Sequence, residues 1–120
     1  MNLIISNKTI DYQQLKSINL DESKNHIPIN EYKTIKFCKE WMGGKTAFRI
    51  NTSGSTGKPR QITITRDQMI ASAHLTGKTF GLEKGDSALV CLSIDHIAGI
   101  MMLVRGFELG LKLTVIPPAS

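Results

Sequence analysis

The residues best suited to chemistry lie in one glycine-rich segment, residues 52–58. Its seven positions hold four hydroxyls, two glycines and one lysine, in the order Thr52, Ser53, Gly54, Ser55, Thr56, Gly57 and Lys58. Glycines let backbone N–H groups turn toward a bound anion without obstruction by a Cβ atom. Hydroxyls donate hydrogen bonds to phosphate oxygens, and the lysine ammonium adds a compact positive charge. The segment is therefore predicted to bind a polyphosphate.

This segment differs from the glycine-rich loops that place phosphate at the start of a helix. The Walker A pattern GxxxxGK[ST] requires a glycine where Thr52 stands and a serine or threonine where Pro59 stands. Pro59 and the alternation over residues 61–65 instead predict a strand after the loop. The loop is thus expected to connect two strands and to bind with its own amides and hydroxyls. A polar hairpin loop without function is the alternative, since glycine, serine and threonine are common in loops.

The ordered string from Thr52 to Pro59 resembles the signature of the adenylate-forming enzymes, which include acyl-CoA synthetases, peptide-synthetase adenylation domains and luciferases. Arg60 stands where that family usually has a lysine, and Asn51 where it usually has an aromatic or small residue. Neither change removes a phosphate contact outright. The resemblance implies that residues 52–58 hold the β- and γ-phosphates of ATP.

A second motif follows after one predicted helix and one predicted strand. Ser93-x-x-His96-x-x-Gly99 resembles the next motif of the same family, with serine in place of the more usual proline. The resemblance implies that His96 and Gly99 line the acyl pocket. The alternative is that His96 is a hydrogen-bonded structural residue.

The wider resemblance implies a reaction as well as a site. Residues 88–106 are most similar to the short bacterial o-succinylbenzoate–CoA ligases of menaquinone synthesis. These are AMP-forming acid–CoA ligases, which join a carboxylic acid to ATP and then to CoA with the help of Mg²⁺. The family's remaining catalytic motifs and magnesium ligands have no counterpart here, so the chain alone is expected to be inactive. A stand-alone phosphate- or nucleotide-binding module without catalysis is the alternative.

The second half of the chain predicts an α/β fold. Residues 88–92 are continuously apolar, as a strand covered on both faces should be. Residues 97–109 predict a buried helix, and residues 113–116 predict another strand. These three form a βαβ unit that is expected to be parallel and right-handed. Because a parallel sheet needs both faces covered, we expect the N-terminal part of a larger domain with a mixed sheet and helices.

The 120 residues are interpreted as one incomplete AMP-binding domain, with a hairpin and helices in residues 1–45 and the loop and βαβ region in residues 46–118. Strands are predicted at residues 3–5, 9–10, 47–50 and 61–65. Helices are predicted at residues 12–18 after an Asp11 cap, at residues 31–42 after an Asn30 cap, and at residues 66–80. Residues 19–30 are polar and predict a loop.

Charge and hydrophobic pattern limit the classes of partner that the sequence predicts. The net charge is +5, but the basic residues are scattered and no aromatic residues are interleaved with them, so no nucleic-acid partner is predicted. No apolar run approaches the ~20 residues that span a membrane, and the apolar start is too short for a secretory signal. The protein is therefore expected to be cytoplasmic without a membrane partner. The sequence does not indicate an oligomeric state.

Several other side chains are interpreted as structural or receive no role. Cys38 and Cys91 share no CxxC spacing, so they are predicted to be buried, reduced thiols and not metal ligands. Met101 and Met102 are expected to pack in the core. Arg105 is interpreted as a structural or solvent-reaching residue, with a substrate carboxylate as the alternative partner. His26 and His74 receive no role.

Overall fold

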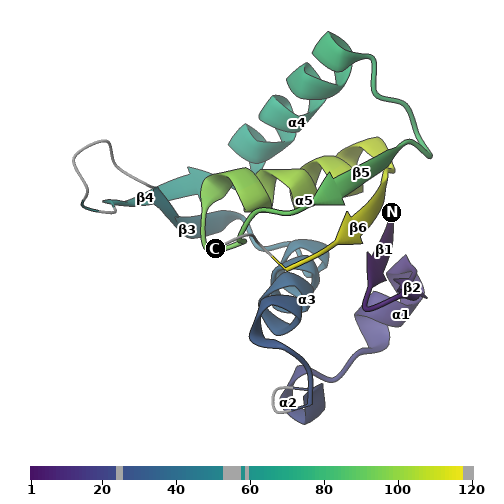
Figure 1. The fold of residues 1–120 in the computed structure, drawn as a ribbon. Helices are drawn as coiled ribbons and strands as arrows, with labels where there is room; N and C mark the ends of the chain where they lie inside the picture. Colours follow the sequence, from purple (N-terminus) through teal and green to yellow (C-terminus); the bar gives the residue numbers. More distant parts are fainter. Residues whose placement is uncertain (24–25, 53–57, 59, 118–120) are drawn as a thin grey trace.

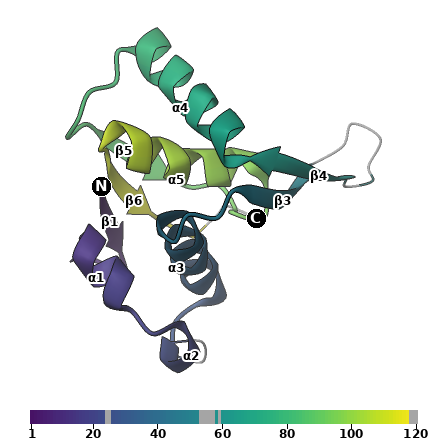
Figure 2. The same cartoon turned by 180° about the vertical axis from the view of Figure 1, so that it is seen from behind.

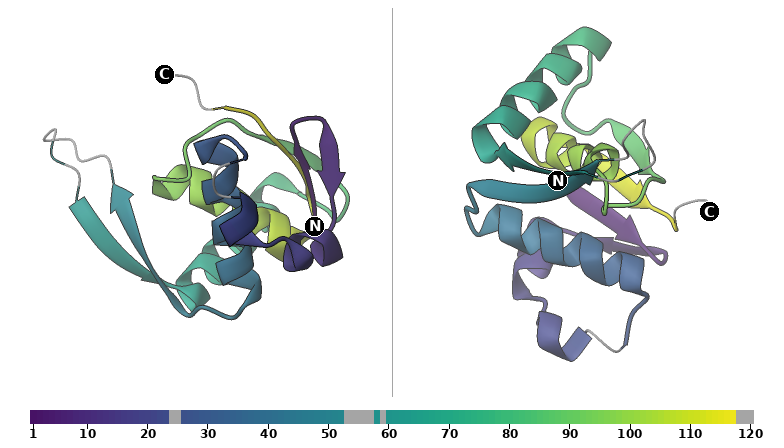
Figure 3. Two further views of the ribbon diagram at one scale, coloured as in Figure 1. Left: turned by 90° about the horizontal axis from the view of Figure 1, so that it is seen from below. Right: turned by 90° about the vertical axis from the view of Figure 1, so that its left-hand side faces the viewer.

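Two sheets organise the residues that the computed structural model describes, which are 1–23, 26–52, 58 and 60–117 (Figure 1). The first sheet is mixed and has the order β2-β1-β6-β5. Its strands are β1 (Asn2–Ile5), β2 (Lys8–Ile10), β5 (Ser87–Val90) and β6 (Lys112–Val115). The second sheet is an antiparallel hairpin of β3 (Ala47–Thr52) and β4 (Arg60–Thr65), which extends to one side of the rest (Figures 1 and 3).

Local patterns explain the first hairpin and the unit that follows the glycine-rich loop. The turn between β1 and β2 has positive φ angles at Ser6 and Asn7, 51° and 63°, which is the geometry that suits the twist of a two-residue hairpin. β5 and β6 pair in parallel across α5 (Ile97–Leu109), as the βαβ pattern predicts. β1 also pairs in parallel with β6, which places the N-terminal strand beside the C-terminal one.

Helix ends follow the sequence signals closely. Asp11 caps α1 (Tyr12–Ser17) in a reciprocal capping box with Gln14. Thr65 caps α4 (Arg66–Phe80) in the same way, and its side chain accepts a hydrogen bond from the backbone N–H of Gln68. Both α4 and α5 end at a left-handed glycine, Gly81 and Gly110.

Three expectations for the N-terminal half and β5 are wrong. The segment predicted as a loop contains a short helix, α2 (Leu20–Ser23), whose first amides donate to the Asn19 side chain. α3 runs over Ile29–Met42 with Pro28 as its N-cap residue, so it begins two residues before the predicted start. The strand predicted to be covered on both faces ends at Val90, and Leu89 is 53% exposed.

One face of the first sheet carries the core. Strand register places Val90, Val115 and Ile5 side by side on this face, and all three are buried. α5 lies over them (Figures 1 and 2), with Leu103 fully buried. The opposite face carries Leu89, which explains its exposure.

An aromatic cluster connects the two sheets through α3. The Trp41 ring lies 5.9 Å from Phe48 of β3 and 6.4 Å from Phe107 of α5, measured between centroids. The Arg66 guanidinium lies 4.0 Å from the Trp41 centroid and donates a hydrogen bond to the Trp41 carbonyl oxygen at 2.7 Å. α3 therefore positions the base of the β3–β4 hairpin against α5.

The two cysteines differ in their exposure to solvent. Cys38 is buried in α3, as predicted, but Cys91 is exposed because it follows the end of β5. The prediction of burial for Cys91 is wrong. Within the described ranges, no helix is both long and apolar enough to cross a membrane.

Candidate phosphate-binding site

The glycine-rich segment joins two paired strands, as its sequence predicts. β3 and β4 are antiparallel, and Thr52 pairs with Arg60 at the tip of the hairpin. β4 begins at Arg60, so the chain continues after the loop as a strand and not as a helix. The predicted phosphate ligands Ser53, Gly54, Ser55, Thr56 and Gly57 lie outside the described residues. Lys58 is described and exposed.

His96 lies beside the end of β3 that is nearer the hairpin tip. The backbone of Asn51 in β3 forms an isolated parallel bridge with His96, which is the N-cap residue of α5. The His96 side chain is exposed and makes no capping hydrogen bond. Asn51, which directly precedes the glycine-rich segment, and His96 of the second motif are thus joined by a backbone bridge across 45 positions of sequence.

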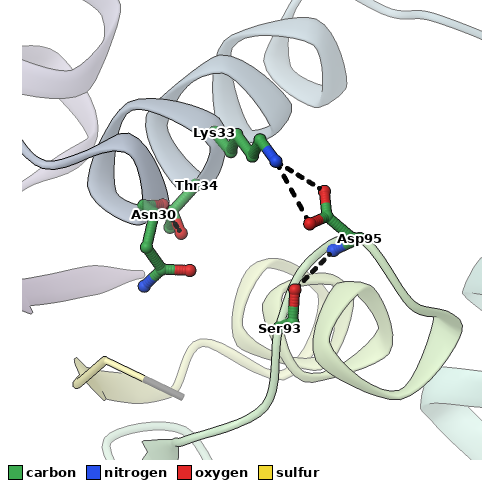
Figure 4. Close-up of polar contacts among 5 residues, drawn as sticks. All are labelled: Asn30, Lys33, Thr34, Ser93 and Asp95. Atoms are coloured by element: carbon green, nitrogen blue, oxygen red, sulfur yellow. Dashed lines mark hydrogen bonds and ion pairs between the residues drawn. The ribbon is translucent and has the colours of Figure 1, made fainter. Parts of the chain in front are cut away.

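The turn before His96 is held by hydrogen bonds within itself and by an ion pair to α3 (Figure 4). The Asp95 backbone N–H donates to the Ser93 hydroxyl oxygen at 3.1 Å, and the His96 N–H donates to the Ser93 carbonyl oxygen at 3.3 Å. Lys33 donates to both carboxylate oxygens of Asp95 at 3.1 Å. α3 thus contacts the same turn that bridges to Asn51.

Gly99 has a clear structural reason to be glycine. It is buried in the first turn of α5, where an added Cβ atom would lie 2.2 Å from the Ser93 carbonyl oxygen and 2.9 Å from that of Leu92. Only glycine allows α5 to approach this backbone so closely. Its place in an acyl pocket stays a prediction.

A mostly apolar cavity of about 270 Å³ includes Ile97 in its lining, but neither His96 nor Gly99. β4, α4 and the start of α5 form it, and Ile97 follows His96 directly. Its lining residues are Ile64, Gln68, Met69, Ser72, Ile97 and Met101. Apolar walls with two polar groups suit a mainly apolar organic ligand that needs orientation. Met101 is therefore both a buried core residue and a wall of this cavity.

Three further side chains, Arg105, His74 and His26, have surroundings of their own. Arg105 donates from Nη1 to the Met102 sulfur at 3.4 Å, and its buried Nε has no hydrogen-bond partner among the described residues. His74 lies 3.2 Å from Glu108 and connects α4 to α5. His26 is exposed. In the part of the chain that the structure describes, no group of three or more His, Cys, Asp or Glu side chains could hold a metal ion.

Comparison with known proteins identifies the family of the chain. The family profile described as AMP-binding enzyme matches residues 4–120. The chain belongs to this family. The match covers the mixed sheet from Ile4 onward, the β3–β4 hairpin and the His96 turn together, and it includes residues 4–45, which carry no recognisable motif.

Individual relatives agree with the family. The chain is 32% identical over 68 residues to a 2-succinylbenzoate–CoA ligase of Bacillus mycoides (strain KBAB4), which is 57% of this chain and 14% of that protein. It is 46% identical to the crystal structure of an acyl-CoA synthetase (AMP-forming)/AMP-acid ligase II-like protein from Dyadobacter fermentans, with a TM-score of 0.74, covering 83% of this chain and 29% of the other.

A further solved structure carries a nucleotide. It is the O-succinylbenzoate coenzyme A synthetase of Bacillus subtilis, in complex with ATP and magnesium ion, which is 26% identical with a TM-score of 0.52. The match covers 60% of this chain and 19% of that one. The chain therefore spans less than a third of each of these relatives, and the fold of this portion is that of adenylate-forming enzymes.

Proposed function

We propose that this chain is the phosphate-binding portion of an ATP-dependent acid–thiol ligase, with o-succinylbenzoate as the acid and CoA as the thiol. The observation that carries the proposal is the loop of residues 52–58 between two paired strands, with the His96 turn bridged to its base at Asn51. Membership of the AMP-binding enzymes supports ATP as the nucleotide. The names of the curated relatives support the acid.

The first chemical step brings two anions together. A carboxylate oxygen attacks the α-phosphorus of ATP, the bond from this phosphorus to the oxygen that bridges to the β-phosphate breaks, and pyrophosphate leaves. The loop supplies one ammonium, from Lys58, together with hydroxyl and amide donors. We assign these groups to the β- and γ-phosphates, where negative charge grows as the bond breaks. Their contacts are expected to strengthen in the transition state.

The second step has different requirements. The CoA thiolate attacks the carbonyl carbon of the acyl-adenylate, and AMP leaves with the electron pair of the broken carbon–oxygen bond. Pyrophosphate has already departed, so the loop has little further role in charge stabilisation. We place the acyl group near His96, because the next residue, Ile97, lines the apolar cavity together with Met101.

A magnesium ion would suit the reaction, but the described residues contain no obvious set of ligands for it. A bound Mg²⁺ ion would share the neutralisation of phosphate charge. Oxygen ligands from carboxylates are what this ion usually takes from a protein, and no cluster of three such residues occurs among those the structure describes. No step in this portion is therefore assigned to the ion.

The test compares both half-reactions in the full-length protein. Lys58→Ala is expected to slow acyl-adenylate formation by about one to two powers of ten, because a lost charge-assisted donor costs ~1.5–3 kcal/mol. Thioester formation from supplied acyl-adenylate should change much less. Lys78→Ala removes an exposed lysine from the last turn of α4 and serves as the matched control. Equal damage to both half-reactions by Lys58→Ala would contradict the assigned role of the loop.

His96 has its own signature in the same assay. His96→Ala is expected to raise the KM for the acid more than the KM for ATP, since the side chain is assigned to the acyl group. A larger rise for ATP would place His96 with the phosphates. Full activity of the variant with an unchanged range of acids would remove it from the site.

A further inference from the structure

The apolar cavity formed by β4, α4 and the start of α5 has two polar side chains in its lining. Met69 and Met101 are buried walls of this cavity, whereas Gln68 and Ser72 are exposed. Gln68 and Ser72 are four residues apart in α4, so both side chains lie on the same face of this helix. None of the six lining residues is charged. A ligand would therefore meet an amide and a hydroxyl, but no charged side chain, among these residues.

The Gln68 amide is arranged to donate hydrogen bonds. Its Oε1 atom accepts a hydrogen bond from the Thr65 backbone N–H at 2.9 Å, which is one half of the capping box of α4. Its Nε2 amino group carries two N–H donors and makes no hydrogen bond within the described residues. The Ser72 hydroxyl makes none there either. The cap thus occupies the acceptor end of Gln68 and leaves the donor end free.

We infer that Gln68 is a specificity-determining residue that donates a hydrogen bond to the ketone oxygen of an aryl ketone held in the apolar cavity. The inference rests on the proposed function, in that the ketone is part of the acid substrate. The two methionine sulfurs suit an aromatic ring, and the free N–H donors suit a neutral carbonyl oxygen. A carboxylate would find no cation among the six lining residues, which favours the neutral oxygen at this position.

The test uses two acids that differ at one carbon. 4-Oxo-4-phenylbutanoate has the ketone, and 4-phenylbutanoate has a methylene group in its place. Each is titrated into the ¹⁵N-labelled chain. Backbone amide signals of residues 68–72 and 97–101 should shift with both acids, whereas the side-chain NH₂ signals of Gln68 should shift only with the ketone. The ketone acid should bind about three- to tenfold more tightly. Unmoved Gln68 side-chain signals, or equal shifts of these signals with both acids, would overturn the inference.

Gln68→Glu separates the donor from the cap. A glutamate at this position of a capping box still accepts from the Thr65 N–H, so the fold should be kept while both N–H donors are lost. Both acids carry one carboxylate, so repulsion by the new charge cancels in the ratio of their affinities, which should fall to about one or below. Gln13→Glu makes the same change at an exposed position of α1 and should leave the ratio unchanged. A ketone preference that survives Gln68→Glu, or that both variants lose equally, would overturn the inference.

Kinetics of the full-length protein keep this inference apart from the proposed function. In Gln68→Glu, the KM for the ketone acid should rise relative to that for the methylene acid, while the KM for ATP stays the same. Adenylation of o-succinylbenzoate with no effect of Gln68→Glu on this ratio would overturn only the role of Gln68. Failure to adenylate any of the three acids, with the Gln68 signals still distinguishing ketone from methylene, would contradict only the proposed function.

Discussion

Gly99→Ala tests why the second motif ends in glycine. The new Cβ atom would lie 2.2 Å from the Ser93 carbonyl oxygen and 2.6 Å from its carbon, whereas ordinary contacts begin at 3.4 Å. All three of the nearest atoms belong to the backbone of residues 92 and 93. Either α5 or the Ser93–His96 turn must therefore move by about 1 Å. Because that turn bridges to Asn51, the C-terminal end of β3 should move with it.

The size of the effect follows from two opposing terms. Overpacking of this kind costs about 1–3 kcal/mol, and a clash with backbone belongs at the upper end. Alanine regains about 1 kcal/mol of helix propensity over glycine. The free energy of unfolding should therefore fall by about 2 kcal/mol, which corresponds to a fall in Tm of roughly 8 °C for a chain of this size.

Gly77→Ala in α4 is the matched control. There the added Cβ would meet Leu109 methyl groups at 2.8 and 2.9 Å, and these side-chain ends can rotate away. The gain in helix propensity and the cost of moving these methyl groups should then nearly cancel. The free energy of unfolding should stay within about 0.5 kcal/mol of the original. Urea unfolding of both variants gives the comparison, and hydrogen exchange of the His96 and Ile100 amides reports on the turn. Equal stabilities for the two variants would refute the packing explanation.

Three other changes have expected outcomes. Cys91 should react with iodoacetamide in the native chain and Cys38 only after unfolding, as peptide mass spectrometry can show, because Cys91 is exposed while burial raises the pKa of the Cys38 thiol. Asp95→Asn should cost at most about 1 kcal/mol in urea unfolding, and less in high salt, because the ion pair with Lys33 is 41% and 50% exposed. Thr65→Ala should lower the free energy of unfolding by about 1 kcal/mol, since it removes the cap of α4.

Much of the local structure follows from the sequence because its signals act over a few residues. The helix at residues 97–109 has the predicted bounds, since its apolar run begins after His96 and stops at Gly110. Pro59 and the alternation that follows it predict two strands joined by residues 53–59, and the antiparallel pairing of β3 with β4 confirms the strands. Glycine at position 99 was part of the motif, but its packing against Ser93 became visible only in three dimensions.

The features that the sequence did not reveal depend on contacts between distant segments. The parallel pairing of β1 with β6 joins residues more than 100 positions apart, and neither strand carries a local mark of its partner. The ion pair between Lys33 and Asp95 spans 62 positions in the same way. Leu89 lies in an apolar run that predicts burial on both faces, yet the packed helix covers only the opposite face of its strand. Helix α2 was missed because its polar residues are typical of a loop.

The most direct test of the account is a titration of the ¹⁵N-labelled chain with magnesium pyrophosphate. Amide signals of residues 52–58 are expected to shift together, and Lys58→Ala is expected to weaken this binding by at least tenfold. Lys78→Ala should leave it unchanged. Shifts that occur elsewhere but not in residues 52–58, or that are insensitive to Lys58→Ala, would contradict the claim that this loop binds the phosphates of ATP.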